Sequence, residues 1–327
     1  MINDVLYGLA SIAIGIAVSY GIYWGLDRLV GLTPDRVQKK IRAWAYLLPA
    51  AVLLIAVLIV PLIQTIIFSF MNENGKKFVG FENYIDLFTD IQFLDILINN
   101  FLWIAIVPAA VVACGLLAAN LTNQVGPTRE KIFKSLIFMP MAISFVSAAT
   151  IWSFIYTNVP PGRPEVGLLN ALVAVFGGEP QAWMLISDWR INSFLLMIII
   201  IWLQTGFAMV LLSSAIKGVP EETMEAARVD GANTLQIFWR IVIPQISGTI
   251  MAVFVTTLIS VMKIFDIVLA MTGGAFKTSV LGYEFYKEYF LNSNVGAASA
   301  IVTILVVLIA PLMYIQVRTV RHQESLR

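Results

Sequence analysis

Histidine and cysteine are almost missing from this 327-residue sequence, which contains one of each. His322 lies in the polar tail, and Cys114 lies within the apolar run 104–119. A single cysteine forms no disulfide within the chain and leaves the redox compartment open. A single histidine outside every long apolar run disfavours a histidine-based catalytic triad, a multi-histidine metal site and a histidine-dependent intramembrane protease.

Charged residues are also scarce. They make up 13% of the chain, and 21 lysines and arginines nearly balance 20 aspartates and glutamates. This balance provides no basic face for nucleic acid and no acidic tail. The phosphate-binding motif G-x-x-x-x-G-K-[ST] is missing too, so the chain cannot bind ATP by that route. Hydrophobic residues make up 59% of the chain instead, which indicates an integral membrane protein.

Seven apolar runs are long enough to cross a bilayer as helices, which takes about 20 residues each. Lipid satisfies no backbone polar groups, so we expect an all-α protein with about seven transmembrane helices. Prolines inside or near the ends of these runs favour kinked helices. The predicted spans are 5–26, 45–70, 98–121, 134–157, 193–216, 247–271 and 297–317.

Positive charges concentrate in alternate loops. Fourteen lysines and arginines lie in 27–42, 122–134, 217–246 and the tail, against six in 72–97, 158–192 and 272–296. The positive-inside rule places the first group in the cytoplasm. We therefore expect the N-terminus outside, the C-terminus inside, and the loop 217–246 inside.

The first run, 5–26, has two interpretations. A cleaved signal peptide would carry basic residues before its apolar stretch, but Met1-Ile-Asn-Asp4 has none, and the basic residues follow the run. We expect an uncleaved first helix. With its basic cytoplasmic linker it forms an extra N-terminal part, 1–42, ahead of a membrane domain over 43–327.

The cytoplasmic loop 217–246 has the pattern of two short helices joined by a turn. Pro220 suits a first helical turn, and Glu221 and Glu222 then meet the positive end of the helix dipole. Gly231 accepts the left-handed conformation that ends a helix. Asn233, with Gln236 three residues later, can cap a second helix.

The faces of the first short helix differ in character. Met224 and Ala227 share one face with Pro220, while Glu221, Glu225 and Arg228 share another and can form ion pairs there. The loop could be an amphipathic segment lying on the inner leaflet. Its four acidic and three basic residues suit an anionic membrane surface poorly, which favours a protein partner.

The loop also carries a spaced motif: E-A-A, three residues, G, nine residues, I-x-I-P. It resembles the loop by which permease subunits of binding-protein-dependent ABC importers contact their ATPases. The resemblance implies a type I ABC importer permease architecture, with ATP and Mg²⁺ bound by partner ATPase subunits and no cofactor on this chain. Ile243 stands where the family usually has leucine. The implied ATPase-coupling residues are Glu225, Ala226, Ala227, Asp230 and Gly231.

Polar residues interrupt two of the predicted spans, and such residues in membranes are functional candidates. The segment 202–207 offers amide, hydroxyl and aromatic groups that suit a sugar. Alternatively, Gln204 bonds a neighbouring helix and Gly206 allows close helix packing. In the next span, Lys263 and Asp266 lie at i,i+3, one turn after Ser260, and can form an ion pair that is either structural or in contact with substrate.

A second resemblance concerns the solute. The stretch from Phe265 to Gly274, with Thr278, Ser279 and 296–300, is similar to carbohydrate ABC permeases. Over about 43–320 the chain resembles the maltose-type F subunit, in a version that suggests α-glucosides. The family's Gly-Gly-Gly-Pro turn reads Gly-Gly-Ala-Phe at 273–276. The candidate substrate-binding residues are Leu203, Gln204, Thr205, Phe207, Ser260, Lys263 and Asp266, of which the resemblance implies the sugar role for Leu203, Gln204 and Phe207.

We therefore expect a non-enzymatic permease subunit in a bacterial or archaeal cytoplasmic membrane, importing a di- or oligosaccharide by alternating access. The resemblance implies a second permease subunit, two ATPase subunits and an extracytoplasmic sugar-binding protein. One alternative is a permease of the same architecture for a non-sugar solute such as glycerol phosphate or a polyamine. A phosphate ligand would need an arginine-rich site, and no span has an arginine away from its ends. The other is a secondary transporter coupled to ions through Lys263 and Asp266; inverted repeats or further carboxylates, which would favour it, are missing.

Overall fold

The computed structural model describes residues 2–159, 162 and 167–325. Within these ranges the chain is helical apart from turns, loops and one isolated β-bridge between Met71 and Phe78. Two compact units separate at Ile67 and Phe68. The predicted boundary after residue 42 separates the extra first helix and its linker from the membrane domain. The division into compact units does not test that boundary, which stays a prediction.

The first unit consists of long apolar helices that belong to two candidate spans, Leu6–Gly31 and Lys40–Phe68. Asp27 joins the first two helices: its Oδ1 accepts a hydrogen bond from the Tyr46 hydroxyl at 2.5 Å and lies 3.4 Å from Arg42 Nη2. The rings of Tyr23 and Tyr46 stack beside this contact. The elements are α1 (Ile2–Gly31), α2 (Asp35–Leu54), the π-helical turn η1 (Ile55–Ile59) and α3 (Val60–Phe68).

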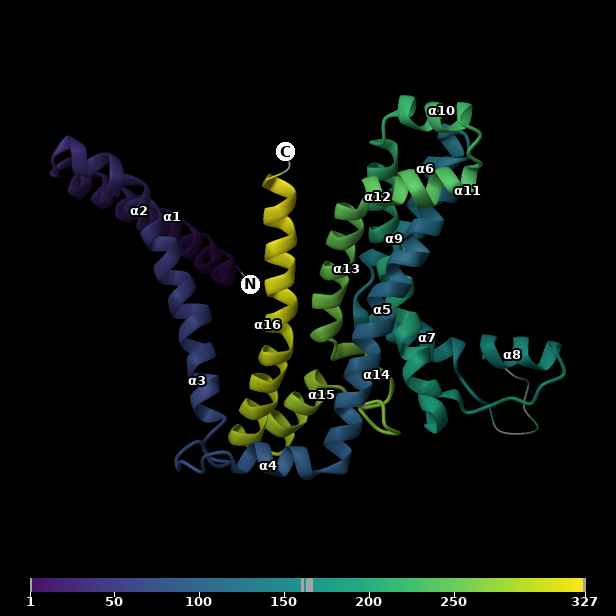
Figure 1. Cartoon of the computed structure of the whole chain (residues 1–327). Coiled ribbons are helices and arrows are strands. Elements are labelled where there is room, and N and C mark those ends of the chain that lie inside the picture. Colours follow the sequence, from purple (N-terminus) through teal and green to yellow (C-terminus); the bar gives the residue numbers. More distant parts are fainter. Residues whose placement is uncertain (1, 160–161, 163–166, 326–327) are drawn as a thin grey trace. The chain divides into compact units, whose positions relative to one another are not determined.

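The second unit holds the remaining elements, in which long helices alternate with short ones. In Figure 1, α10 and α11 lie beyond one end of the long helices α5 and α9, and α4 and α15 lie toward the other end. In chain order they are α4 (Glu82–Thr89), α5 (Ile91–Asn123), α6 (Pro127–Phe138), η2 (Met139–Ala142), α7 (Phe145–Ile155), α8 (Leu168–Val175), η3 (Trp183–Leu185), η4 (Asp188–Arg190), α9 (Ile191–Lys217), α10 (Glu221–Val229), α11 (Thr234–Ile237), η5 (Phe238–Val242), α12 (Ile243–Gln245), α13 (Ser247–Met262), α14 (Asp266–Met271), α15 (Leu281–Tyr286), η6 (Lys287–Leu291) and α16 (Val295–Ser325).

The core of the second unit lies where α5 packs against α9 and α13. Trp103 and Val107 of α5 and Leu196 and Met209 of α9 are fully or almost fully buried. A glycine allows the close approach: a Cβ atom on Gly115 would lie 2.5 Å from the Cβ of Ala208. Small residues at such crossings bring helix backbones together, which is how helices associate in membranes.

The structure supports the all-α prediction and corrects two of the seven spans. Five helices are long and apolar enough to cross a membrane, and two bent pairs raise the number to seven in the described part of the chain. The predicted span 134–157 is broken, because Pro127–Ala142 meets Phe145–Ile155 at 105°. Pro140 lies at this bend, where it lacks an N–H to continue a helix. The predicted span 247–271 ends at Met262.

A carboxylate holds three segments together at the end of the unit away from α10. Asp95 Oδ1 lies 2.6 Å from Arg190 Nη2, and Asp95 Oδ2 lies 3.2 Å from Lys277 Nζ. Both cations have left-handed backbone conformations, with φ of 56° and 61°. Non-glycine residues adopt this conformation only where surrounding contacts hold them. Asp95 therefore stabilises two strained loop segments on one helix end.

We predict that Asp95→Asn lowers the stability of the protein by about 1–2 kcal/mol, because the two cations lose the charge of their shared partner. The measurement is thermal unfolding of the detergent-solubilised protein. Asp90→Asn is the matched control, since Asp90 caps α5 by accepting a hydrogen bond from Gln92 N and asparagine caps equally well. Equal melting temperatures for both variants would contradict the proposed role of Asp95.

Candidate functional site

A cavity of about 440 Å³ lies beside the bend between α6 and α7. Three elements bring polar groups to it: the amide of Gln204 from α9, the carboxylate of Asp266 from α14, and the hydroxyl of Ser144 from the bend. The rest of the wall is apolar. The lining residues are Met141, Ile143, Ser144, Phe145, Val146, Leu203, Gln204 and Asp266.

The amide and the carboxylate lack partners within this chain. Neither Gln204 nor Asp266 forms a side-chain hydrogen bond or ion pair with any residue that the structure describes. Polar groups in an apolar setting are unfavourable unless water or a bound molecule satisfies them. The two side chains are therefore available to a solute in the cavity. The alternative prediction, a hydrogen bond from Gln204 to a neighbouring helix, is not formed among the residues that the structure describes.

One side of α9 packs against α6, and the opposite side lines the cavity. Gly206 faces α6, where an added Cβ atom would lie 2.4 Å from the carbonyl oxygen of Ile137. Residues two apart on a helix point about 200° apart, which turns Gln204 toward the cavity. Thr205 donates its hydroxyl to the carbonyl of Ile201 at 2.6 Å, and half-buried Phe207 is outside the cavity lining.

The predicted ion pair between Lys263 and Asp266 is wrong. The helix α13 ends at Met262 and α14 begins at Asp266, so the i,i+3 geometry of a continuous helix does not exist there. No ion pair joins the two residues among those that the structure describes. Lys263 lines a separate, mostly apolar cavity of about 340 Å³. Ser260 donates its hydroxyl to the carbonyl of Thr256 in its own helix.

The polar loop folds as the two short helices α10 and α11, as predicted. Pro220 precedes α10 as its N-cap. Gly231 ends it with a φ of 82°, while its N–H bonds Arg228 O at 3.1 Å and the N–H of Ala232 bonds Ala227 O at 2.9 Å. These two bonds form a Schellman motif. Asn233 and Gln236 then form a reciprocal capping box at 2.9 and 2.8 Å.

The two faces of α10 have different surroundings. Met224 and Ala227 pack on a small apolar cluster formed by Val219, Ile237, Val242 and Ile246. Glu225, Ala226 and Asp230 are exposed, as is Gly231. The predicted ion pairs of Arg228 with Glu221 and Glu225 are not formed among the described residues, so that face is open. The chain's own packing fixes the position of α10 and leaves its acidic side uncovered.

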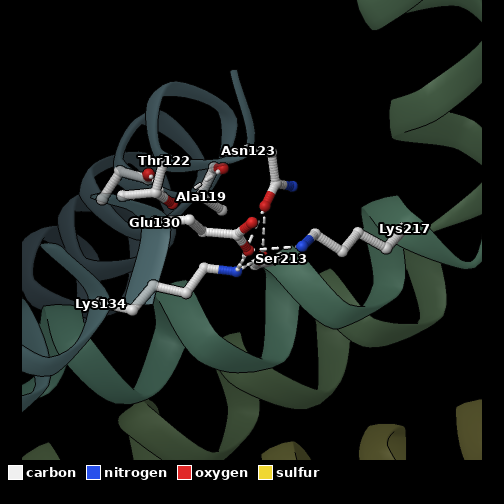
Figure 2. Close-up of polar contacts among 8 residues, drawn as sticks. Ala119, Thr122, Asn123, Glu130, Lys134, Ser213 and Lys217 are labelled. Carbon is white, nitrogen blue, oxygen red and sulfur yellow. Dashed lines mark hydrogen bonds and ion pairs between the residues drawn. The ribbon is translucent and has the colours of Figure 1, made fainter. Parts of the chain in front are cut away.

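A polar cluster that the sequence did not reveal lies where α5, α6 and α9 meet. Figure 2 shows Glu130 between two lysines: its Oε1 lies 2.6 Å from Lys134 Nζ and 2.5 Å from Lys217 Nζ. Lys134 also donates to Ser213 and, at 3.2 Å, to Asn123. The i,i+4 spacing of Glu130 and Lys134 was visible in the sequence. The approach of Lys217, 87 residues away, was not.

The family model and the relatives that match this chain all describe transport proteins of one kind. Residues 111–322 match the model of the family described as "Binding-protein-dependent transport system inner membrane component". The chain is 45% identical to the alpha-glucoside transport system permease protein AglF of Rhizobium meliloti, over 89% of this chain and 85% of that protein. It is 46% identical to the osmoprotective compounds uptake permease protein GgtC of Synechocystis sp., over 86% of this chain and all of that protein.

The fold is also found among solved structures. A chain of a bacterial ABC transporter involved in the import of the acidic polysaccharide alginate superposes with a TM-score of 0.74. The alignment covers 88% of this chain and 99% of that chain, at 21% sequence identity. At this identity the likeness shows a shared fold, that of an ABC importer permease, and by itself says nothing about the solute.

We predict that Gly231→Val opens the turn after α10, because a β-branched residue is strained at this positive φ. Hydrogen exchange of the amides in 221–237 should then quicken about tenfold, corresponding to about 1.4 kcal/mol of local stability. Gly231→Asn is the matched control, since asparagine tolerates the left-handed region. Unchanged exchange in the valine variant would show that the turn does not depend on glycine.

Proposed function

Because the chain belongs to the family of binding-protein-dependent transport system inner membrane components, we propose that it forms one half of the path for a neutral di- or oligosaccharide of the α-glucoside class. It is a membrane-spanning permease subunit of an ABC importer and not an enzyme. The name of the relative AglF supports the solute class, and so does the chemistry of the cavity beside Gln204.

The unpaired amide and carboxylate of that cavity are the observation that carries the proposal. They offer directional hydrogen bonds to sugar hydroxyls, and Phe145 offers an aromatic ring to a sugar C–H face. The third polar group, the Ser144 hydroxyl, already bonds Ser147 as the cap of α7. A carboxylate with no cation in the lining repels anionic solutes, which disfavours a sugar phosphate or glycerol phosphate. Membership in a family of ABC importer permeases disfavours the ion-coupled alternative.

The relative GgtC supports a second candidate, a small osmoprotective compound. Osmolytes include neutral polyols as well as zwitterions, so both kinds are tested. Uptake by the assembled importer is measured for labelled α-linked disaccharides and for small neutral and zwitterionic osmolytes. Saturable, ATP-dependent uptake of a disaccharide supports the first proposal, and uptake of the osmolyte alone supports the second.

The remaining parts of the importer follow from the family and from the polar loop. We propose a second permease subunit, two ATPase subunits that bind ATP and Mg²⁺, and an extracytoplasmic sugar-binding protein. The N-terminus lies outside, the C-terminus and α10 lie in the cytoplasm, and the exposed acidic face of α10 contacts an ATPase subunit. Closure of the ATPases moves α10, and the cavity then opens alternately to each side.

We predict that Gln204→Ala raises the half-saturating sugar concentration for transport about tenfold, because one hydrogen bond to the solute contributes about 1–1.5 kcal/mol. The measurement is the initial rate of uptake against sugar concentration in proteoliposomes. Thr205→Val is the matched control, since the Thr205 hydroxyl is already bonded within its helix. An unchanged concentration dependence in the alanine variant would remove Gln204 from the solute path.

Glu225→Lys should reduce uptake at least about tenfold through the reversed charge at the ATPase contact. The variant should insert and assemble normally, because Glu225 is exposed and makes no side-chain bond with a described residue. Uptake and co-purification of the ATPase subunits are measured together. Glu179→Lys makes the same charge change in an exposed loop away from α10 and should have no effect. Normal uptake by Glu225→Lys would contradict the proposed contact.

A further inference from the structure

Two sets of contacts fasten α6 to α9. At one end, Lys217 Nζ lies 2.5 Å from Glu130 Oε1, and Lys134 contacts both Glu130 and Ser213. At the other end, Gly206 lies against α6 so closely that an added Cβ atom would be 2.6 Å from the Cα of Phe138. The contacts pair the first turns of α6 with the end of α9, so the two helices run antiparallel.

The ionic contact is partly protected from water. The side chains of Glu130 and Lys134 are 16% and 22% exposed and Ser213 is buried, whereas the side chain of Lys217 is 52% exposed. Asn123 at the end of α5 accepts hydrogen bonds from Ser213 at 2.6 Å and from Lys134 at 3.2 Å. Networks of charged groups screened from water contribute more than isolated exposed pairs do.

One end of this helix pair leads directly into the polar loop. Lys217 is the last residue of α9, and Val219, two residues later, is buried in the cluster on which α10 packs. Only Gly218, Val219 and Pro220 separate Lys217 from the first residue of α10. A displacement of α10 is therefore transmitted to the Lys217 end of α9 over a very short connection.

The other end of the pair forms part of the cavity. Beyond Phe138, α6 continues into η2, which contributes Met141, while α9 contributes Leu203 and Gln204. Asp266 approaches from α14, which packs on α7. When α6 and α9 move together, Met141 and Gln204 keep their spacing and both shift relative to Asp266.

We propose that Glu130 is a positioning residue that makes α6 follow α9, so that a displacement of α10 reaches the Gln204 cavity as one rigid movement. The inference rests on the proposed function for the displacement of α10. Without the carboxylate, the Gly206 contact and the bond from Lys134 to Ser213 still join the two helices, but their Lys217 ends can separate. Part of the displacement is then lost before it reaches the cavity, and less solute is transferred for each ATP hydrolysed.

Glu130→Gln tests the proposal in the assembled importer, reconstituted with its ATPase subunits and binding protein. The number of sugar molecules transported per ATP hydrolysed should fall about tenfold, within the usual range of coupling between sites. Lys131→Gln on the same helix is the matched control, since Lys131 is exposed and forms no ion pair with a described residue. A wild-type ratio in Glu130→Gln would overturn the proposal.

A double-mutant cycle separates positioning from general stability. Lys217→Gln alone should lower the transport ratio, and Glu130→Gln combined with Lys217→Gln should lower it no further than the worse single variant, because both changes break the same contact. Fully additive losses would show that Glu130 acts independently of Lys217 and would overturn the proposal.

A distance measurement works without any sugar and keeps this inference separate from the proposed solute. Spin labels are placed on cysteines at Lys131 in α6 and Leu211 in α9, both exposed positions, with Cys114→Ser removing the native thiol. On addition of Mg-ATP the distance between the labels should stay constant in the otherwise native importer and change with Glu130→Gln. A distance that changes equally in both would refute the rigid movement even if sugar uptake is normal.

Discussion

The close approach of α9 to its neighbours is the constraint on which the rest of the second unit depends. Gly115 of α5 brings that helix against Ala208 on one side, and Gly206 brings α9 against the backbone of α6 on another. Lipid tails provide no hydrophobic force between helices, so such backbone contacts supply much of their adhesion. With these faces committed to packing, Leu203 and Gln204 are left to line the cavity.

The cavity derives its chemical character from the breaks in the neighbouring helices. The bend of 105° between α6 and α7 exposes Ser144, and the end of α13 at Met262 separates Asp266 from Lys263. A continuous α13 would have allowed the two charges to neutralise each other. The break instead turns the carboxylate into a free acceptor beside an unpaired amide, which is what a hydroxyl-rich neutral solute needs.

Contacts within this chain define the shape of the polar loop. The Schellman turn at Gly231, the capping box at Asn233 and the cluster around Val219 fix its shape, while its acidic face makes no ion pair with a described residue. A preformed contact surface loses little conformational entropy on binding. Such a loop can transmit a displacement, because a flexible one would absorb it.

The sequence by itself determined the helical class, most of the spans and the internal structure of the polar loop. These depend on apolar run length and on contacts within a few residues, such as Asn233 with Gln236, so local patterns are enough to predict them. Only the tertiary structure decided that Glu130 meets Lys217, that Gly206 meets Ile137, and that Lys263 and Asp266 stay apart. The first two contacts join distant parts of the chain, and the third depends on a helix break at Lys263 that neither proline nor glycine signals, so packing between helices decides all three.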